Sequence, residues 1–154
     1  MGSAQAIRRI NAPADLVWGF ISWRGMAQLA GDGLFAGVDF ETDEVAVGAI
    51  KRINFHSGAP MRERLEWLDE GGLAYRYRVL DSGSYPVASY EALVRVTAMG
   101  DRECAVVIRS DFVAIGISDT AFAASWIEME NGLLTEIANR SEARAGVSPA
   151  GVTA

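Results

Sequence analysis

Hydrophobic and polar residues alternate along most of the middle of the chain. The alternating segments are 34–41, 45–55, 61–68, 73–80, 87–97 and 103–115, and residues that favour turns separate them. A period of two sends alternate side chains to opposite faces of a strand. The pattern therefore predicts an antiparallel meander of six strands, and a shorter alternating segment at 4–11 predicts one strand before it.

Helical spacing replaces this alternation in three other segments. Pro13 stands where a helix has its first residue, and the apolar positions that follow it predict a short helix over 13–22. A second short helix is predicted at 26–30. Residues 119–140 predict the only long helix, with one apolar stripe along it. The stripe consists of Phe122, Trp126, Met129, Leu133 and Ile137.

These elements predict an α+β domain in which a curved antiparallel sheet of six to seven strands wraps around the long C-terminal helix. A sheet with one apolar face needs a cover, and the long helix is the only predicted element able to supply it. One helix does not fill the concave side of a strongly curved sheet, so we expect a ligand cavity between them. The predicted domain covers residues 1–141. Residues 142–154, rich in Ala, Gly and Ser, are predicted to form a disordered tail.

The composition argues against several classes of protein. Half of the 154 residues are hydrophobic, which supports a full core and argues against disorder. The net charge of −6 and the lack of a basic cluster argue against nucleic-acid binding. No segment resembles a secretory signal or approaches the roughly 20 apolar residues of a membrane span. The single cysteine, Cys104, rules out an internal disulfide, and we expect a cytoplasmic protein.

The chain offers little for a metal centre or for nucleophilic catalysis. His56 is the only histidine, and it falls at the end of a predicted hairpin, where we expect it to be exposed or at a rim. One histidine without a cysteine pair does not indicate a zinc site. Cys104 is interpreted as a small core residue. We therefore expect no metal and no organic cofactor.

The alternation also predicts which side chains face the cavity. If Leu65 points inward, Trp67 and Glu63 lie on the same face, and the preceding strand contributes Lys51 and Phe55. The other strands contribute the predicted inward residues Tyr75, Tyr77, Tyr90, Ile108 and Phe112.

Lys51 and Glu63 are the exceptions among these inward positions because both are charged. They lie on adjacent strands of one predicted hairpin, and an unpaired charge inside an apolar cavity is costly. Two interpretations stay open. Glu63, held by Lys51, acts as a general base or a ligand anchor with a shifted pKa, or the two residues form a fixed ion pair that orients the hairpin.

Tyrosine hydroxyls and one helix carboxyl are the other candidates for chemistry. Tyr75, Tyr77 and Tyr90 either donate hydrogen bonds to a carbonyl or phenolate of the ligand, or their rings only line the cavity. On the long helix, Trp126 is interpreted as a packing residue that borders the ligand. Glu130 either faces solvent or forms a second carboxylate at the cavity mouth.

Four short motifs follow one another in the order found in a known superfamily. They are Ala12-Pro13 with Val17-Trp18, then Gly48-Ala49-Ile50-Lys51, then Glu63-Arg64-Leu65 with Asp69, then Tyr75-Arg76-Tyr77 with Pro86 and Tyr90. Together they span about residues 7–137 and resemble the helix-grip (START and birch-pollen-allergen-like) superfamily, most nearly its bacterial polyketide cyclase/dehydrase group. Lys51 stands where the strand motif of that group has arginine.

The resemblance implies a helix-grip fold with a small hydrophobic or aromatic ligand in its cavity. The superfamily contains aromatic polyketide cyclases, other carbon–carbon bond-forming enzymes, hydrolases, hormone receptors and lipid carriers, so the fold is a weak guide to the reaction. Three functions stay open. The first is a cofactor-independent cyclase, dehydratase or lyase that uses Glu63 and a tyrosine. The others are a carrier or sensor of an apolar ligand and a helper subunit that binds another protein. A homodimer also stays open.

Overall fold

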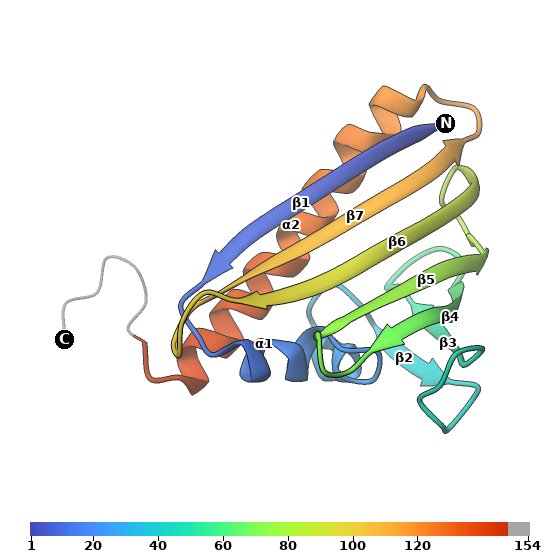
Figure 1. Ribbon diagram of the computed structural model, residues 1–154. Helices are drawn as coiled ribbons and strands as arrows, with labels where there is room; N and C mark the ends of the chain where they lie inside the picture. The colour runs from blue at the N-terminus through green and yellow to red at the C-terminus, as the bar shows by residue number, and fades with distance from the viewer. Residues whose placement is uncertain (148–154) are drawn as a thin grey trace.

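A curved sheet wraps around one long helix (Figure 1). The computed structural model describes residues 1–147. The strands are β1 (Gly2–Ile10), β2 (Gly37–Phe40), β3 (Ile50–Asn54), β4 (Met61–Asp69), β5 (Ala74–Asp81), β6 (Val87–Ala98) and β7 (Cys104–Ala114). The helices are α1 (Ala14–Ile21), the 3-10 helix η1 (Gly25–Leu29) and α2 (Asp119–Arg144).

The seven strands form one antiparallel sheet in the order β1-β7-β6-β5-β4-β3-β2. Strands β2 to β7 pair in sequence order, as the alternation predicts, and β1 pairs with the outer edge of β7. The short helices α1 and η1 follow β1, and α2 follows β7. The predicted helix-grip fold, with a curved seven-stranded sheet around a long C-terminal helix, is confirmed.

Helix α2 crosses the concave side of the sheet and packs chiefly against β1, with further contacts to α1 and β7 (Figure 1). The hydroxyl of Ser118 caps the helix by accepting a hydrogen bond from the Ala121 amide at 3.0 Å. One stripe of the helix is buried, which accounts for its position against the sheet. The stripe contains Phe122, Trp126, Glu130, Leu133, Leu134, Ile137, Ala138 and Ser141. Helix α2 lies nearest to the strands β1 and β7 at one edge of the sheet. The inner faces of β3, β4 and β5 therefore border an internal space between the sheet and α2.

Several predicted boundaries differ from the structure, among them the start of the strand predicted at 34–41, which begins only at Gly37. The strand predicted at 45–55 begins only at Ile50, because Gly48 adopts a left-handed backbone with φ of 96° and the segment before Ile50 forms turns and bends. Helix α2 continues to Arg144, so residues 142–144 of the predicted disordered tail are helical. Burial of Ser141 on the inner stripe keeps the last turns of the helix packed. The remaining part of the predicted tail, from residue 148 onward, lies outside the described residues.

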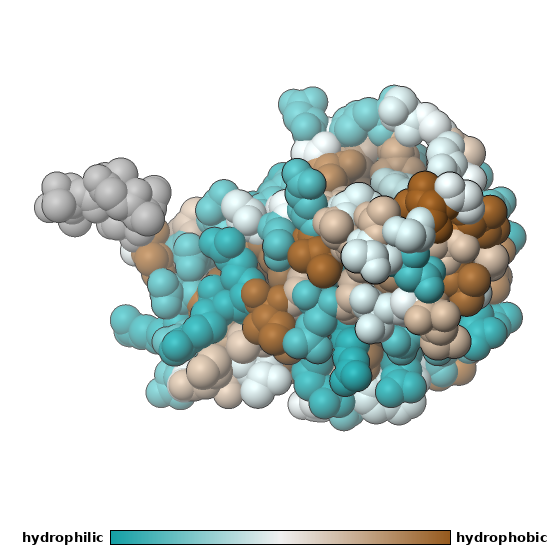
Figure 2. Space-filling model, turned by 90° about the horizontal axis from the view of Figure 1, so that it is seen from above, coloured by the Kyte–Doolittle hydropathy of each residue, from teal (hydrophilic) through white to brown (hydrophobic). Residues whose placement is uncertain are grey.

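The surface seen from above carries separate small hydrophobic areas among hydrophilic residues (Figure 2). Among the large apolar side chains that are exposed, Val113, Ile115 and Ile117 follow one another at the end of β7 and in the turn to α2. Association of two copies stays a prediction. Within residues 1–147, no helix combines the length and the apolar character needed to cross a membrane.

Candidate functional site

An internal cavity of about 50 Å³ lies between the sheet and α2. Most of its wall is aliphatic, aromatic or methionine side chains. Among residues 1–147, the only charged side chains that line it are Glu63 from β4 and Glu130 from α2. Engineered cavities that bind benzene are larger, roughly 150 Å³. A ring-sized ligand therefore requires some lining side chains to move. The flexible side chains of Met26, Met61 and Met129 belong to the wall and suit such movement.

Lys51 and Glu63 face each other across the β3–β4 hairpin, as the alternation predicts. The Lys51 Nζ lies 3.9 Å from the Glu63 Oε1, and both side chains are buried. The ammonium also donates a hydrogen bond to the Trp23 carbonyl at 3.0 Å and lies 4.1 Å from the centre of the Trp23 ring. Lys51 is absent from the cavity wall, so it lies behind Glu63 and supplies its counter-charge.

Burial dominates the ionisation of this pair. It lowers the pKa of Lys51 to about 8, and Glu63 opposes that shift. It raises the pKa of Glu63, and the charge of Lys51 opposes that shift in turn. The pair thus combines a fixed structural contact with a carboxyl that reaches the cavity, which leaves both sequence interpretations of Glu63 in place.

Tyr75 lines the cavity, but its hydroxyl donates a hydrogen bond of 2.8 Å to the Ile21 carbonyl at the end of α1. Its pKa is raised well above 10 by burial, so the phenol stays neutral. This contact joins β5 to α1, and it leaves the hydroxyl without a free proton for a ligand. We therefore do not assign to Tyr75 the predicted role of donating a hydrogen bond to the ligand.

The contact of Tyr75 gives a first testable prediction. Tyr75→Phe should lower the free energy of unfolding by about 1–2 kcal/mol, because the Ile21 carbonyl loses a buried partner. Tyr85→Phe is the matched control, because the Tyr85 hydroxyl contacts only the weak acceptor Met129 Sδ at 3.7 Å. Urea unfolding measures both variants. Equal losses in the two variants would contradict this account of the hydroxyl.

Glu130 belongs to a buried hydrogen-bonded cluster on the opposite wall. Its Oε1 accepts hydrogen bonds from the hydroxyls of Tyr90 at 3.2 Å and Ser110 at 3.3 Å. The Tyr90 and Ser110 hydroxyls lie 2.8 Å apart, and the Trp126 indole donates to the Tyr90 hydroxyl at 2.8 Å. The Tyr77 hydroxyl donates to that of Tyr90 over a longer distance of 3.4 Å. The cluster thus links α2 to β5, β6 and β7.

The second carboxyl oxygen of Glu130, Oε2, is buried and has no hydrogen-bond partner among the described residues. Burial raises the pKa of Glu130 to about 7, against the opposing effect of the hydrogen bonds from Tyr90, Ser110 and Trp126. Of the two positions open for Glu130 in the sequence, the structure favours a carboxyl that lines the cavity, since only 3% of the residue is exposed. A buried carboxyl with an unfilled acceptor and a pKa near neutrality is typical of functional sites.

Most of the other predicted ligand-contacting residues line the cavity or lie next to its wall. Phe55, Tyr77, Ile108 and Trp126 line it, and Tyr90 supports it through the Glu130 cluster. Phe112 is not in the wall; its ring packs 4.6 Å from the ring of Phe122, farther toward the start of α2. Sequence reasoning placed Met129 on the apolar stripe of the long helix but missed Met26, Met61 and the role of Ser110, although Ser110 is a lone hydroxyl on the apolar face of its strand.

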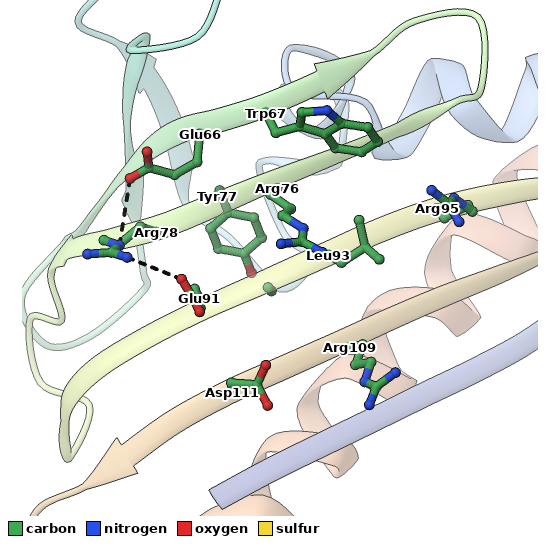
Figure 3. A pocket seen from close by; sticks show the side chains of 11 residues that line it. Glu66, Trp67, Arg76, Tyr77, Arg78, Glu91, Leu93, Arg95, Arg109 and Asp111 are labelled. Atoms are coloured by element: carbon green, nitrogen blue, oxygen red, sulfur yellow. Dashed lines mark hydrogen bonds and ion pairs between the residues drawn. The ribbon is translucent and has the colours of Figure 1, made fainter. Parts of the chain in front are cut away.

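The predicted inward position of Trp67 is wrong. The pairing of β4 with β5 shifts register between Leu65 and Trp67, so Glu66 is an extra residue that reverses the alternation after it. Trp67 is 38% exposed and lies on the outer face of the sheet. Figure 3 shows it there beside Arg76 and Leu93. These residues line an open hollow with a volume of about 650 Å³. Its ring therefore lies outside the internal cavity.

The outer hollow is mainly a charged, solvent-facing part of the sheet. Arg78 forms ion pairs with Glu66 at 3.7 Å and with Glu91 at 3.3 Å (Figure 3). These groups lie on the face that the alternation predicts to be polar. Mixed charges on the solvated side of an antiparallel sheet are ordinary, so the internal cavity is the better candidate for the functional site.

The structure also locates the residues considered for metal binding. His56 is exposed, as predicted, and its Nε2 lies 2.8 Å from the Gly33 carbonyl oxygen. Cys104 is buried in the core, as predicted. Across residues 1–147, no group of three or more His, Cys, Asp and Glu side chains could hold a metal ion.

Known structures share this architecture at low sequence identity. The aromatase/cyclase ZhuI from Streptomyces sp. R1128 superposes with a TM-score of 0.76 at 17% identity, covering 98% of each chain. A point mutant of Thalictrum flavum norcoclaurine synthase, in complex with a transition-state analogue, gives 0.70 at 18%, with 93% of this chain and 95% of that chain covered. The Bacillus cereus protein XoxI gives 0.78 at 15%, with 92% and 96% covered. These likenesses show the fold.

The sequence itself identifies the family. A search of curated proteins gives no significant match. A family model described as polyketide cyclase / dehydrase and lipid transport matches residues 1–142, which include all of the strands and nearly all of α2. The chain therefore belongs to the polyketide cyclase / dehydrase and lipid transport family.

Proposed function

We propose that this protein binds a small hydrophobic or aromatic molecule between the sheet and α2 and acts on it by acid–base chemistry, as a cofactor-independent cyclase, dehydratase or lyase. The observation that carries the proposal is the pair of buried carboxyl groups, Glu63 and Glu130, on the wall of one largely apolar cavity. Family membership supports a ligand-binding role of this kind.

The arrangement of the two carboxyls suits proton transfer at both ends of a bound molecule. A group with a pKa near neutrality can accept a proton and return it at physiological pH. Burial moves Glu130 into this range and also raises the pKa of Glu63. An aldol-type closure followed by loss of water needs one group that takes a proton from carbon and one that gives a proton to the departing oxygen. Glu63 and Glu130, on β4 and α2, would serve these two roles with the ligand held between them.

Tyr77 and Tyr90 would assist without changing their own ionisation. Burial raises the pKa of both phenols well above 10, so they act as neutral hydrogen-bond donors. The Tyr77 ring lines the cavity, and within the described part of the chain its hydroxyl makes only the long hydrogen bond to Tyr90. Tyr77 can therefore turn toward a ligand oxygen on which negative charge develops, at little cost to the fold.

A carrier or sensor without turnover is the second candidate. The polar groups nearest to the hairpin already have structural partners, since Lys51 binds the Trp23 carbonyl and Tyr75 binds the Ile21 carbonyl. The rest of the wall is mainly apolar. A ligand held only by this wall would be bound and released unchanged.

The two candidates are separated by following a ligand and its product. Native mass spectrometry of the protein purified from its own cells would identify a retained small molecule, and liquid chromatography would then follow the conversion of that molecule. Glu63→Gln should slow conversion about 100-fold or more while binding persists, because a general acid or base contributes at least that much. Trp67→Ser, on the outer face, should leave conversion unchanged.

Glu63→Gln leaves the buried ammonium of Lys51 without its counter-charge, so its folding must be checked. The double variant Lys51→Met/Glu63→Gln removes that charge and should also be inactive. Conversion that continues at the wild-type rate in this folded double variant would contradict a catalytic role for Glu63. Binding without conversion in every protein, the wild type included, would establish the carrier instead.

A further inference from the structure

The internal cavity has acidic groups and no basic ones on its wall. Lining residues within the described part of the chain include Glu63 and Glu130 but no lysine, arginine or histidine. The two carboxyls are not equivalent. Glu63 has the Lys51 ammonium at 3.9 Å as its counter-charge, whereas Glu130 forms no ion pair with any other described residue. The ionised cavity therefore carries one negative charge that the protein does not balance locally.

Among residues 1–147, the side chains that join Glu130 in its hydrogen-bonded cluster are all neutral. From the sheet these groups are Tyr77 on β5, Tyr90 on β6 and Ser110 on β7, and on α2 the neighbour is Trp126. Both tyrosines remain neutral because burial raises the pKa of each. The other carboxyl of the cavity wall, Glu63, is paired with the Lys51 ammonium behind it, and the charges of that pair oppose each other.

One carboxyl oxygen of Glu130 remains available as a hydrogen-bond acceptor among residues 1–147. Oε1 is occupied by the Tyr90 and Ser110 hydroxyls, and Oε2 is buried without a partner among residues 1–147. An unpaired buried carboxylate oxygen is costly, and a charged hydrogen-bond donor compensates such a group most strongly. The aromatic rings of Trp126, Tyr77 and Phe55 share the wall, and the faces of such rings attract cations.

We propose that the cavity selects ligands that carry a protonated amine, and that Glu130 binds this ammonium group among the aromatic rings. The inference rests on the proposed function and names the class of ligand for the same site. A cavity of about 50 Å³ has room for the ammonium group and the carbon next to it. The half-buried lining residues Leu34, Phe55 and Met129 mark the side nearest to solvent, so the apolar part of the ligand extends there.

Three probes of nearly equal shape and different charge test the proposal: benzylamine, benzyl alcohol and benzoate. Isothermal titration at pH 8, where Glu130 is mostly ionised and the amine is still protonated, should give benzylamine an affinity about tenfold or more above that of benzyl alcohol. Benzoate should bind weakest, because its charge repels both carboxyls. Glu130→Gln should abolish the preference for the amine and leave the affinity for the alcohol within about twofold.

The pH dependence of the affinity for benzylamine is a second test, because a purely structural role of Glu130 would not change it. The affinity for benzylamine should fall as the pH is lowered from 8 to 5, since protonation of Glu130 through its pKa of about 7 removes the negative charge. The affinity for benzyl alcohol should stay nearly constant. Glu128→Gln is the matched control, because Glu128 is an exposed carboxyl on the same helix. It should leave both profiles unchanged.

The outcomes separate this proposal from the proposed function. Equal binding of amine and alcohol, or an amine preference that survives in Glu130→Gln, would overturn the ammonium site while leaving a cavity for neutral aromatic ligands. Tighter binding of benzoate than of benzylamine would overturn it as well. Absence of binding by benzylamine would also contradict it, whereas the proposed function would still be decided by the retained ligand and its conversion.

Discussion

Lys51→Met should lower the free energy of unfolding by about 3–5 kcal/mol at pH 7, where Lys51 is mostly charged; this is the typical cost of removing one partner from a buried ion pair. The Lys51 side chain is buried and is held by the Glu63 carboxyl at 3.9 Å and the Trp23 carbonyl at 3.0 Å. In the variant, both acceptors lose their charged partner. Urea unfolding at several pH values measures the loss.

The loss should shrink as the pH is lowered toward 4.5. Without Lys51, the folded-state pKa of Glu63 lies even farther above its ordinary value of 4.5. The folded state then binds more protons than the unfolded state between these two pKa values, so stability falls as the pH rises through that window. Protonation at low pH removes the unpaired charge and restores part of the stability.

Two further variants make this prediction specific. Arg52→Met changes the next residue, which points outward and forms an exposed ion pair with Asp39 at 2.8 Å, so its cost should stay below about 1 kcal/mol. The double variant Lys51→Met/Glu63→Leu removes both buried charges and should recover most of the lost stability. Similar losses of stability in Lys51→Met and Arg52→Met, or no recovery in the double variant, would contradict the claim that Lys51 and Glu63 stabilise each other as a buried ion pair.

Glu130→Gln should make the protein more stable at pH 8 than the wild type, although the residue is buried in a hydrogen-bonded cluster. The folded-state pKa of Glu130 is about 7, above its ordinary value of 4.5. The folded state therefore binds more protons than the unfolded state between pH 4.5 and 7, and this contribution to stability is lost as the pH rises through the window. The difference in pKa corresponds to about 3 kcal/mol at pH 8.

Glutamine resembles the protonated carboxyl and does not ionise, so it avoids this loss. Between pH 5 and pH 8, the stability of Glu130→Gln relative to wild type should rise by about 2–3 kcal/mol in urea unfolding. Glu128→Gln, on the exposed side of α2, should change stability by less than about 0.5 kcal/mol at both pH values. A relative stability of Glu130→Gln that does not vary with pH would contradict the raised pKa.

A residue that costs stability at neutral pH and is nevertheless present points to a function that needs it. Proteins commonly sacrifice stability at sites of binding and catalysis. If Glu130→Gln is more stable and also loses its preference for amines, the two results together identify Glu130 as a functional residue of the cavity. If Glu130→Gln is more stable but keeps its preference for amines, the results support the raised pKa of Glu130 and not a role in binding.

The sheet could be predicted from the sequence because a period of two leaves little freedom once one inward residue is known. Lys51, Glu63, Tyr75 and Tyr90 are buried as this rule requires. The rule fails for Trp67 because one extra residue at the Glu66 bulge reverses the alternation, and nothing in the local composition marks the bulge. The fold is thus encoded in periodicity, whereas its local exceptions depend on strand pairing.

The cluster around Glu130 could be predicted only in part. Glu130 follows Trp126 by four residues and precedes Leu133 by three, so it lies on the buried stripe of α2. From the sequence alone, a solvent-facing position and a position at the cavity mouth both stayed open for Glu130. The choice between them, and the partners on β6 and β7, depend on how α2 is rotated against the sheet. Periodicity within a single element carries no information about that rotation. The volume of the cavity depends on the packing of side chains from several elements, and it was likewise beyond the sequence.

The central claim, that ligands bind between the sheet and α2, is tested most directly by the indole N–H signals of the tryptophans in a ¹⁵N-labelled protein. Trp126 lines the cavity, whereas Trp67 lies on the outer face. Assignment uses the variants Trp126→Phe and Trp67→Phe. On titration with benzylamine and benzyl alcohol, the account predicts a saturable shift of the Trp126 signal and no shift of the Trp67 signal. A saturable shift of Trp67 alone, or no shift of Trp126 with either compound, would contradict the account.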